Sequence, residues 1–293
     1  MRENGRVTSA SESPLPARPR LIATDLDGTL LRDDKTVSER TVAALAAAED
    51  AGIEVFFVTG RPARWMGIVS DHVHRHGLAI CANGAVVVDL RGGPAGAGEL
   101  VKVRGLDPAV ALGVVRALRD AAPGTSFAVE RTTSFDYEPQ YPPFLDDPGV
   151  TVASAEKLLQ EAGAGDGDAI VKLLAHHPTL TPDSFLTLAR TAAGHLAAFT
   201  RSSPTALLEI SGLGVSKAST LALCCAERGI SSDEVVAFGD MPNDVEMLGW
   251  AGTSYAMGNA HPDVIAAASG RTVANNEDGV AVVIERLVAR ARA

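Results

Sequence analysis

Short apolar runs and predicted helices follow one another along the first part of the chain. The runs at 21–23 and 53–58 have the length and composition of buried strands. The stretch at 36–52 is predicted to be a helix, and Pro62 suits the first turn of another helix that runs toward Gly77. Strands that alternate with helices in this way predict an α/β fold, in which helices cover both faces of a parallel sheet.

Local signals predict where these elements start and turn. Thr36 and Glu39 have the spacing of a capping box, and Gly52 suits the end of the same helix. The apolar run at 78–90 is interrupted by Asn83 and a following glycine, which is a hairpin signal. We therefore predict a strand, a turn and a strand there, with Asn83 as a turn residue and not a catalytic one.

The alternation of strand and helix breaks after a glycine-rich stretch and resumes more than a hundred residues later. Residues 91–210 mix strands and helices without the regular order and predict an inserted α+β domain. Residues 20–90 and 211–293 are expected to form together one Rossmann-like core domain with a parallel sheet. Residues 1–19 are rich in Ser, Pro and Arg and are expected to be a disordered leader.

Composition excludes several classes of function. The chain has 46% hydrophobic and 21% charged residues, which is ordinary for a globular protein with a sizeable core. Its net charge of −10 argues against nucleic acid as a partner, because phosphate backbones require a basic face. It has neither an apolar run of membrane-spanning length nor a secretory signal. The three cysteines do not form a disulfide pattern, so a reducing cytoplasm is the default location.

Polar residues recur where the predicted core strands end. Asp25 and Asp27 follow the first strand, Thr59 follows the strand 53–58, and Asp240 follows a strand near 235–239. In open α/β sheets the carboxyl ends of the strands form one rim, where ligands bind. These side chains can therefore share a site, and Lys217, at the start of a helix, lies within reach of it.

The sequence motifs that contain these residues resemble those of a known protein family. In order along the chain, "DLDGT", "VTG", "GVSKAS" and "GDMPND" resemble the four motifs of the haloacid dehalogenase-like (HAD) hydrolase superfamily. "CANGA" and the large insertion between the second and third motifs are similar to the Cof-type branch, whose inserted domain is called a C2 cap. The resemblance implies a Mg²⁺-dependent phosphatase that hydrolyses small phosphorylated metabolites through an aspartyl-phosphate.

The resemblance also implies a role for each site residue. Asp25 is the expected nucleophile, and Asp27 the acid that protonates the leaving oxygen and then activates water. Asp25, the backbone carbonyl of Asp27 and Asp240 are expected to hold Mg²⁺, which favours oxygen ligands, with Asp244 as a direct ligand or a supporting residue. The residues expected to bind the phosphoryl oxygens are Leu26 and Gly60 through their N–H groups, and Thr59, Lys217 and Asn243 through their side chains.

Two alternative functions stay open at this point. A phosphosugar mutase of the phosphomannomutase type would have a similar architecture but would return the phosphoryl group to the sugar. A catalytically silent binding protein could also use the same scaffold. The presence of Asp25, Asp27, Lys217 and Asp240 together argues against the silent scaffold. Without its neighbours, the Asp25–Asp27 pair could equally be a turn.

Other conspicuous residues are expected to be structural. Arg61 is expected to pair with an acid. His72 and His76 share a helix face but have no identifiable third metal ligand. His176 and His177 end a strand and are expected to be structural as well. An aromatic cluster in the inserted segment could line a substrate pocket, but we expect it to pack the core; it comprises Phe135, Tyr137, Tyr141 and Phe144.

Overall fold

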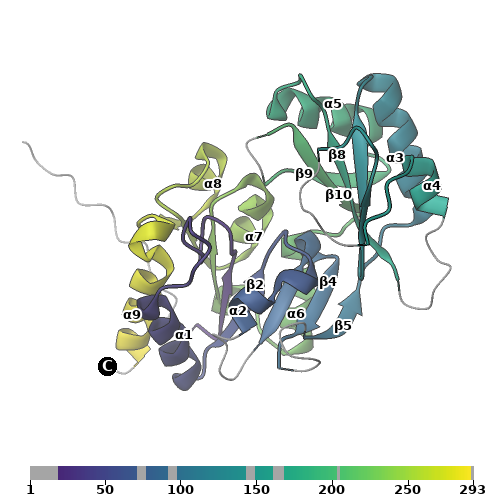
Figure 1. Ribbon diagram of the computed structural model, residues 1–293. Helices are drawn as coiled ribbons and strands as arrows, with labels where there is room; N and C mark the ends of the chain where they lie inside the picture. The colour runs from purple at the N-terminus through teal and green to yellow at the C-terminus, as the bar shows by residue number, and fades with distance from the viewer. Residues whose placement is uncertain are drawn as a thin grey trace, which may run out of the picture.

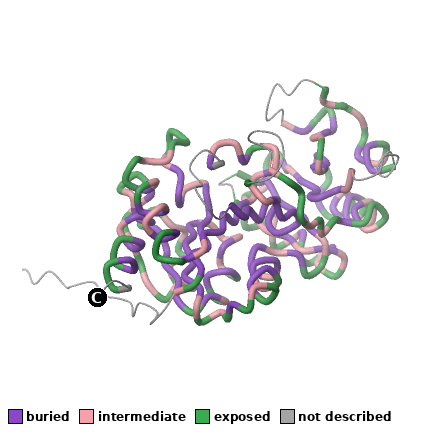
Figure 2. Tube along the Cα trace, turned by 90° about the horizontal axis from the view of Figure 1, so that it is seen from below, coloured by how far each residue is buried: buried purple, intermediate pink, exposed green. Residues whose placement is uncertain are grey.

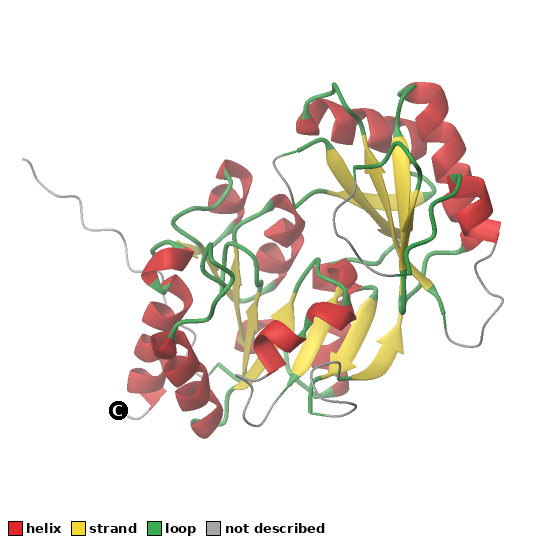
Figure 3. Cartoon of the chain, viewed as in Figure 1, coloured by secondary structure: helices red, strands yellow, loops and turns green. Residues whose placement is uncertain are grey.

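The computed structural model describes residues 19–70, 77–91, 98–142, 149–160, 168–202 and 205–291. These residues form an eight-stranded and a five-stranded sheet, each with its own helices (Figures 1 and 3). The strands of the larger sheet are β1 (Leu21–Thr24), β2 (Glu54–Val58), β3 (Leu78–Cys81), β4 (Val86–Asp89), β5 (Glu99–Val103), β11 (Val235–Gly239), β12 (Thr253–Ala256) and β13 (Gly270–Arg271). Their spatial order is β13-β12-β11-β1-β2-β3-β4-β5.

Helices cover both faces of the larger sheet, as the alternation of elements predicted. One face packs against α1 (Glu39–Asp50) and α9 (Gly279–Ala291), and the other against α6 (Lys217–Glu227), α7 (Val245–Trp250) and α8 (Pro262–Ala267). Successive strand residues point to opposite faces, so both sets of positions must be apolar. The central strands are accordingly buried along their length (Figure 2).

The sheet is parallel from β13 to β3, while β4 and β5 run antiparallel at its edge. The turn between β3 and β4 is the predicted hairpin. Asn83 adopts left-handed backbone angles there (φ 54°, ψ 34°), which confirms it as a turn residue. The fold class is thus the predicted one, with a mixed edge added to the parallel core.

The predicted start of α1 is wrong by two residues. Its N-cap is Ser38, whose hydroxyl accepts a hydrogen bond from the Thr41 N–H. Thr36 instead donates its hydroxyl and its N–H to the Asp34 carboxylate, and so belongs to the preceding turn. Gly52 does follow the helix end, with a φ of +81°.

The helix expected from Pro62 to Gly77 is only partly present. A 3₁₀ turn (Ala63–Trp65) and a short α2 (Gly67–Ser70) occupy its first half. Residues 71–76, which include His72 and His76, lie outside the described residues, as do residues 1–18 of the expected leader. No helix in the described part of the chain is long and apolar enough to cross a membrane.

The five-stranded sheet, here called the cap sheet, is antiparallel throughout. Its strands and helices are β6 (Ser126–Arg131), β7 (Phe135–Tyr137), β8 (Ile170–His176), β9 (Ala197–Thr200), β10 (Leu207–Gly212), α3 (Pro108–Ala121), α4 (Ala155–Gln160) and α5 (Pro182–Ala193). One face is covered by these helices, through residues such as Phe127, Leu173 and Leu208. The alternate residues of the same strands form the other face, which carries the charged side chains described below.

The change from one sheet to the other does not coincide with the expected boundary at residue 90. Strand β5 lies within the expected inserted range 91–210 but is hydrogen-bonded to β4 of the larger sheet. The chain passes to the cap sheet between β5 and α3, and returns between β10 and α6. We propose that the two sheets mark two domains joined at these crossings.

Candidate active site

Three adjacent strands deliver polar residues to one end of the larger sheet. Asp25 follows β1, Thr59 follows β2 and Asp240 follows β11, and these strands are neighbours in the sheet. Lys217, the first residue of α6, reaches the same place. All four side chains are buried. The structure therefore brings together the residues that the strand ends predicted.

The innermost part of the site is a cluster of three carboxylates around one ammonium. Oxygen atoms of Asp25, Asp240 and Asp244 lie within 4.8 Å of one another. Lys217 Nζ donates to Asp25 Oδ1 and to Asp244 Oδ1, at 2.6 Å each. The second oxygen of Asp244 accepts the N–H groups of Asp240 and Met241, at 3.0 and 3.1 Å. Asp244 thus orients both the lysine and the loop that carries Asp240.

The charges in this cluster do not balance. Burial raises the pKa of Asp25 well above its usual range, and Asp244 and Asp240 add to the effect against the opposing charge of Lys217. Burial and the nearby Asp244 raise the pKa of Asp240 to about 7. Burial alone would lower the pKa of Lys217, but Asp244 and Asp25 outweigh it and raise that pKa. An oxygen-lined cluster with excess negative charge is chemically suited to a divalent cation such as Mg²⁺.

Gly28 makes the close approach of the first loop to Asp240 possible. Its φ is +74°, and a β-carbon there would lie 2.2 Å from Asp240 Oδ2. Thr29, the next residue, donates its hydroxyl to Asp240 Oδ1 at 3.0 Å. The "DGT" segment therefore fixes the Asp240 carboxylate, and glycine is the residue that leaves room for it.

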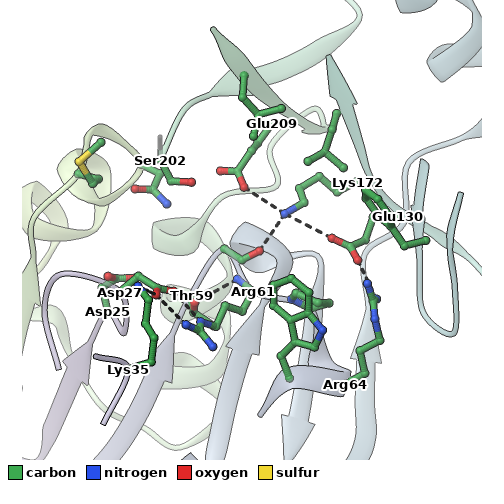
Figure 4. Close-up of a pocket in the computed structure, with 18 of the residues that line it drawn as sticks. Asp25, Asp27, Lys35, Thr59, Arg61, Arg64, Glu130, Lys172, Ser202 and Glu209 are labelled. Carbon is green, nitrogen blue, oxygen red and sulfur yellow. Dashed lines mark hydrogen bonds and ion pairs between the residues drawn. The ribbon is translucent and has the colours of Figure 1, made fainter. Parts of the chain in front are cut away.

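Asp27 lies nearer the surface and is held by two cations. Arg61 donates from Nε and Nη2 to its two oxygens at 2.6 and 2.7 Å, and Lys35 donates at 2.8 Å (Figure 4). Partial burial opposes ionisation, but the bonds from Arg61 and Lys35 outweigh it and lower the pKa of Asp27 to about 2. The expectation that Arg61 pairs with an acid is confirmed.

Thr59, Leu26 and Asn243 were also predicted to bind the phosphoryl oxygens, and their contacts are as follows. The Thr59 hydroxyl accepts the Arg61 N–H at 3.0 Å, which keeps the loop after β2 tightly turned. The side chain of Leu26 is buried in the core beneath the loop. The Asn243 amide donates to Asn83 Oδ1 at 3.1 Å.

A cavity of about 350 Å³ extends from Asp25 and Asp27 to the cap sheet (Figure 4). Its far side carries Glu130, Lys172 and Glu209, from β6, β8 and β10. The sequence did not lead us to predict these three residues as part of the site. Lys172 and Glu209 are charged residues inside largely apolar strands, and that is a signal that could have found them. Glu130 is followed by Arg131 at the end of β6, where this signal is weaker.

Ion pairs connect these residues to each other and to the core. Lys172 Nζ lies 3.1 Å from Glu209 Oε1 and 3.6 Å from Glu130 Oε2. Arg64, in the turn after β2, donates to Glu130 at 2.7 Å. The cap sheet thus meets the core through charged groups around the cavity.

Part of the cavity wall is apolar and aromatic. It includes Trp65, Phe135, Tyr141, Leu174 and Leu207. Tyr141 also packs against Leu174 and Leu207, which agrees with the expected packing role. Phe135, on the edge strand β7, and Tyr141 nevertheless line the cavity.

Phe144 and His177 were also expected to be structural. Phe144 lies outside the described residues. His177 is structural, as expected, because its Nδ1 accepts the N–H groups of Thr179 and Leu180 and its Nε2 lies 3.2 Å from the Pro123 carbonyl.

Comparison with known proteins gives consistent matches over most of the chain. A family model described as haloacid dehalogenase-like hydrolase matches residues 22–284. The 5-amino-6-(5-phospho-D-ribitylamino)uracil phosphatases YitU and YcsE of Bacillus subtilis strain 168 are 29% and 30% identical, over 91% and 92% of this chain and 97% and 96% of theirs. The structure of BT1666 from Bacteroides thetaiotaomicron, a phosphatase of the same superfamily, has a TM-score of 0.76 at 22% identity and covers 94% of this chain and 99% of its own. That last similarity concerns the fold alone.

Proposed function

Because the chain belongs to the haloacid dehalogenase-like hydrolase family, we propose that it is a Mg²⁺-dependent phosphatase of small phosphorylated metabolites that works through an aspartyl-phosphate. The observation that carries the proposal is the position of Asp25. It is buried beside Lys217 in an acidic cluster, at the inner end of a cavity that has a second acid, Asp27, at its edge.

In the first step, an Asp25 oxygen attacks phosphorus and the bond from phosphorus to the ester oxygen breaks. Lys217, the Thr59 hydroxyl, the N–H groups of Leu26 and Gly60, and Asn243 bind the phosphoryl oxygens as negative charge shifts onto them. Catalysis of this kind depends on positioning and charge stabilisation. Attack by a carboxylate also divides a slow hydrolysis into two easier steps.

Asp27 moves the protons in both steps. It protonates the departing ester oxygen, and then removes a proton from the water that attacks the aspartyl-phosphate and releases inorganic phosphate. In the structure Asp27 is ionised by its bonds to Arg61 and Lys35. A bound phosphate dianion offers these two cations a second partner and also places negative charge beside Asp27. Both effects raise the pKa of Asp27, so that the carboxyl can take up the proton that it then delivers to the ester oxygen.

The acidic cluster fits Mg²⁺ by its donor set and its charge. The carboxylates of Asp25 and Asp240 and the backbone carbonyl of Asp27 would hold the ion, with Asp244 either as a further ligand or as the residue that orients Lys217 and the Asp240 loop beside it. Mg²⁺, when bound, neutralises carboxylate and phosphate charge and orients the phosphoryl group. Three carboxylates beside a single ammonium are the feature of this chain that supports the assignment.

The cavity narrows the choice of substrate. The two curated relatives act on a phosphorylated ribityl chain attached to a uracil ring, according to their names. The cavity offers polar groups such as Glu130 and Lys172 beside an aromatic wall that includes Trp65 and Phe135. We propose a phosphorylated polyol attached to a flat heterocycle as the preferred substrate, with 5-amino-6-(5-phospho-D-ribitylamino)uracil as the first compound to assay.

A phosphate-release screen tests the function. The panel contains this compound, flavin mononucleotide, pyridoxal phosphate and several sugar phosphates, each with Mg²⁺, and Asp25→Asn is the control. We expect free phosphate from the wild type and none from the variant. Isomerised sugar phosphate without free phosphate would instead identify a mutase, and no turnover of any compound would indicate a silent scaffold.

A further inference from the structure

We propose that Glu209 and Asn83 are positioning residues that orient the Asn243 amide toward the phosphoryl group, and that they do so only when the cap sheet lies over the site. The inference rests on the proposed function, in which Asn243 binds a phosphoryl oxygen. It gives a function to Glu209 and Asn83, which lie outside the four motifs that contain the proposed catalytic residues.

The three side chains form a continuous hydrogen-bonded chain. Asn83 Nδ2 donates to Glu209 Oε2 at 2.9 Å, and Asn83 Oδ1 accepts from Asn243 Nδ2 at 3.1 Å. Asn83 and Glu209 are 2% and 5% exposed, so water does not compete with the bond between them. Glu209 also accepts from Lys172 Nζ at 3.1 Å. Burial opposes its ionisation, but Lys172 and Asn83 outweigh it and keep the Glu209 pKa below its usual range.

The chemistry of these groups allows one orientation. An ionised carboxylate only accepts hydrogen bonds, so the NH₂ group of Asn83 must face Glu209. The carbonyl of Asn83 then faces Asn243 and can only accept, so the NH₂ group of Asn243 must face Asn83. One N–H of that amide is used in this bond, and the second is left for a phosphoryl oxygen.

The orientation of the Asn243 amide leaves one buried oxygen without a hydrogen bond, which costs stability and therefore indicates a function. Asn243 Oδ1 is buried and has no hydrogen-bond partner among the described residues. An unsatisfied buried acceptor costs about 1–3 kcal/mol. An unconstrained amide would turn to relieve this cost. The chain from Glu209 through Asn83 holds it, as expected where a donor must be presented to a ligand.

Asn83 lies in a turn that is held by hydrogen bonds and close packing, which suits a residue that must orient Asn243. Its N–H donates to the Thr59 carbonyl at 3.0 Å, so it is bonded to the loop that we assign to phosphate binding. The next residue, Gly84, has a φ of +100°, and a β-carbon there would lie 2.2 Å from the Ser216 carbonyl oxygen. The turn is therefore packed directly against the start of the helix that carries Lys217.

The cap sheet supplies the other end of the chain. Glu209 lies on β10, whereas Asn83 lies in the turn between β3 and β4 of the larger sheet. A second contact joins the two sheets: Lys172, on β8, donates from Nζ to the Gly60 carbonyl at 2.8 Å (Figure 4). Both contacts join the cap sheet to groups of the proposed phosphate site. The phosphate site is thus complete only while the cap sheet covers it.

The test uses Asn83→Gly, which keeps the left-handed turn and removes the amide. The matched control is Asp278→Gly, because Asp278 is also a non-glycine residue with left-handed angles (φ 59°, ψ 41°) and a polar bond, here to Arg32. Thermal unfolding verifies that both variants fold. The probes are p-nitrophenyl phosphate with Mg²⁺ for kcat and KM, and inorganic phosphate as a competitive inhibitor.

We expect Asn83→Gly to lower kcat/KM by roughly 10- to 100-fold, as for the loss of a buried hydrogen bond to a charged group, and to weaken phosphate inhibition in the same direction. Asp278→Gly should leave both unchanged. In an Asn243→Ala background Asn83→Gly should have almost no further effect, because its action passes through Asn243. Glu209→Gln, which can present either an oxygen or an NH₂ group to Asn83, should lower kcat/KM less than Asn83→Gly.

Two results would overturn the inference. One is an Asn83→Gly enzyme with the kinetics of the Asp278→Gly control, and the other is independent, multiplicative effects of Asn83→Gly and Asn243→Ala. Either result leaves wild-type phosphate release intact, and is therefore distinct from failure of the proposed function, in which the wild type releases no phosphate at all.

Discussion

Replacing Gly28 with alanine should greatly lower the activity of the enzyme without unfolding it. The added β-carbon would lie 2.2 Å from Asp240 Oδ2 and 2.8 Å from its Cγ. Contacts under about 3 Å do not occur between such atoms, so the Asp240 carboxylate must move by roughly an ångström. The bond from the Thr29 hydroxyl to Asp240 Oδ1 would be strained by the same movement.

Two separate costs follow, and they can be measured apart. The φ of +74° is unfavourable for alanine and should lower the free energy of unfolding by about 1–2 kcal/mol. Displacement of a proposed Mg²⁺ ligand by about an ångström should lower kcat/KM by about 100-fold, and should raise the Mg²⁺ concentration needed for half-maximal activity.

Gly52→Ala is the matched control, because Gly52 has a φ of +81° and nothing within 4 Å of its β-carbon position. It should lose similar stability and keep its activity. The assay is phosphate release at several Mg²⁺ concentrations, alongside thermal unfolding of both variants. A Gly28→Ala enzyme as active as Gly52→Ala, with the same Mg²⁺ dependence, would refute the reasoning.

Three further predictions concern the same site. Asp27→Asn should slow formation of the aspartyl-phosphate from alkyl phosphates by about 100- to 10,000-fold and far less from p-nitrophenyl phosphate, because nitrophenolate leaves without a proton; equal losses for both kinds of ester, with no burst of nitrophenol, would assign the acid elsewhere. EDTA should abolish activity and Mg²⁺ restore it, whereas Ca²⁺ should substitute poorly because its coordination shell is larger and looser; full activity in metal-free buffer would exclude the mechanism. Lys217→Met should reduce the free energy of unfolding by about 3–5 kcal/mol, since it leaves buried carboxylates without their cation; a denaturation midpoint equal to the wild type would contradict this.

The part of the site that the sequence predicted is the part encoded locally. Asp25, Thr59 and Asp240 each follow an apolar run, and the rule that parallel strands end at one rim is enough to bring them together. Lys217 was predicted from its position at a helix start within reach of this rim, and the structure shows it buried against two acids.

The cap side of the cavity was not predictable in the same way. Glu130, Lys172 and Glu209 come from three antiparallel strands, and whether they meet depends on register. In the structure Glu130 is opposite Lys172, and Glu209 is opposite Leu174. A shift of one residue would have sent these charges into the helix-covered face. The register is set by long-range pairing that no short motif records.

Boundary errors have a similar origin. Strand β5 looked like part of the insertion because it follows a glycine-rich break, but its backbone pairs with β4 across that break. Thr36 looked like a helix cap because its spacing was right, but Asp34 competes for its N–H and hydroxyl. In both places a tertiary or neighbouring hydrogen bond outweighed a plausible local signal.

The central claim is that Asp25 carries the phosphoryl group during turnover. The most direct measurement is rapid acid quench of Asp27→Asn with p-nitrophenyl phosphate and Mg²⁺, followed by peptide mass analysis. We expect one phosphoryl group on the peptide that contains Asp25, accumulating because the variant forms the intermediate faster than it hydrolyses it, and none in the Asp25→Asn enzyme. A burst of nitrophenol with no phosphorylated Asp25, or a phosphoryl group on another residue, would contradict the account.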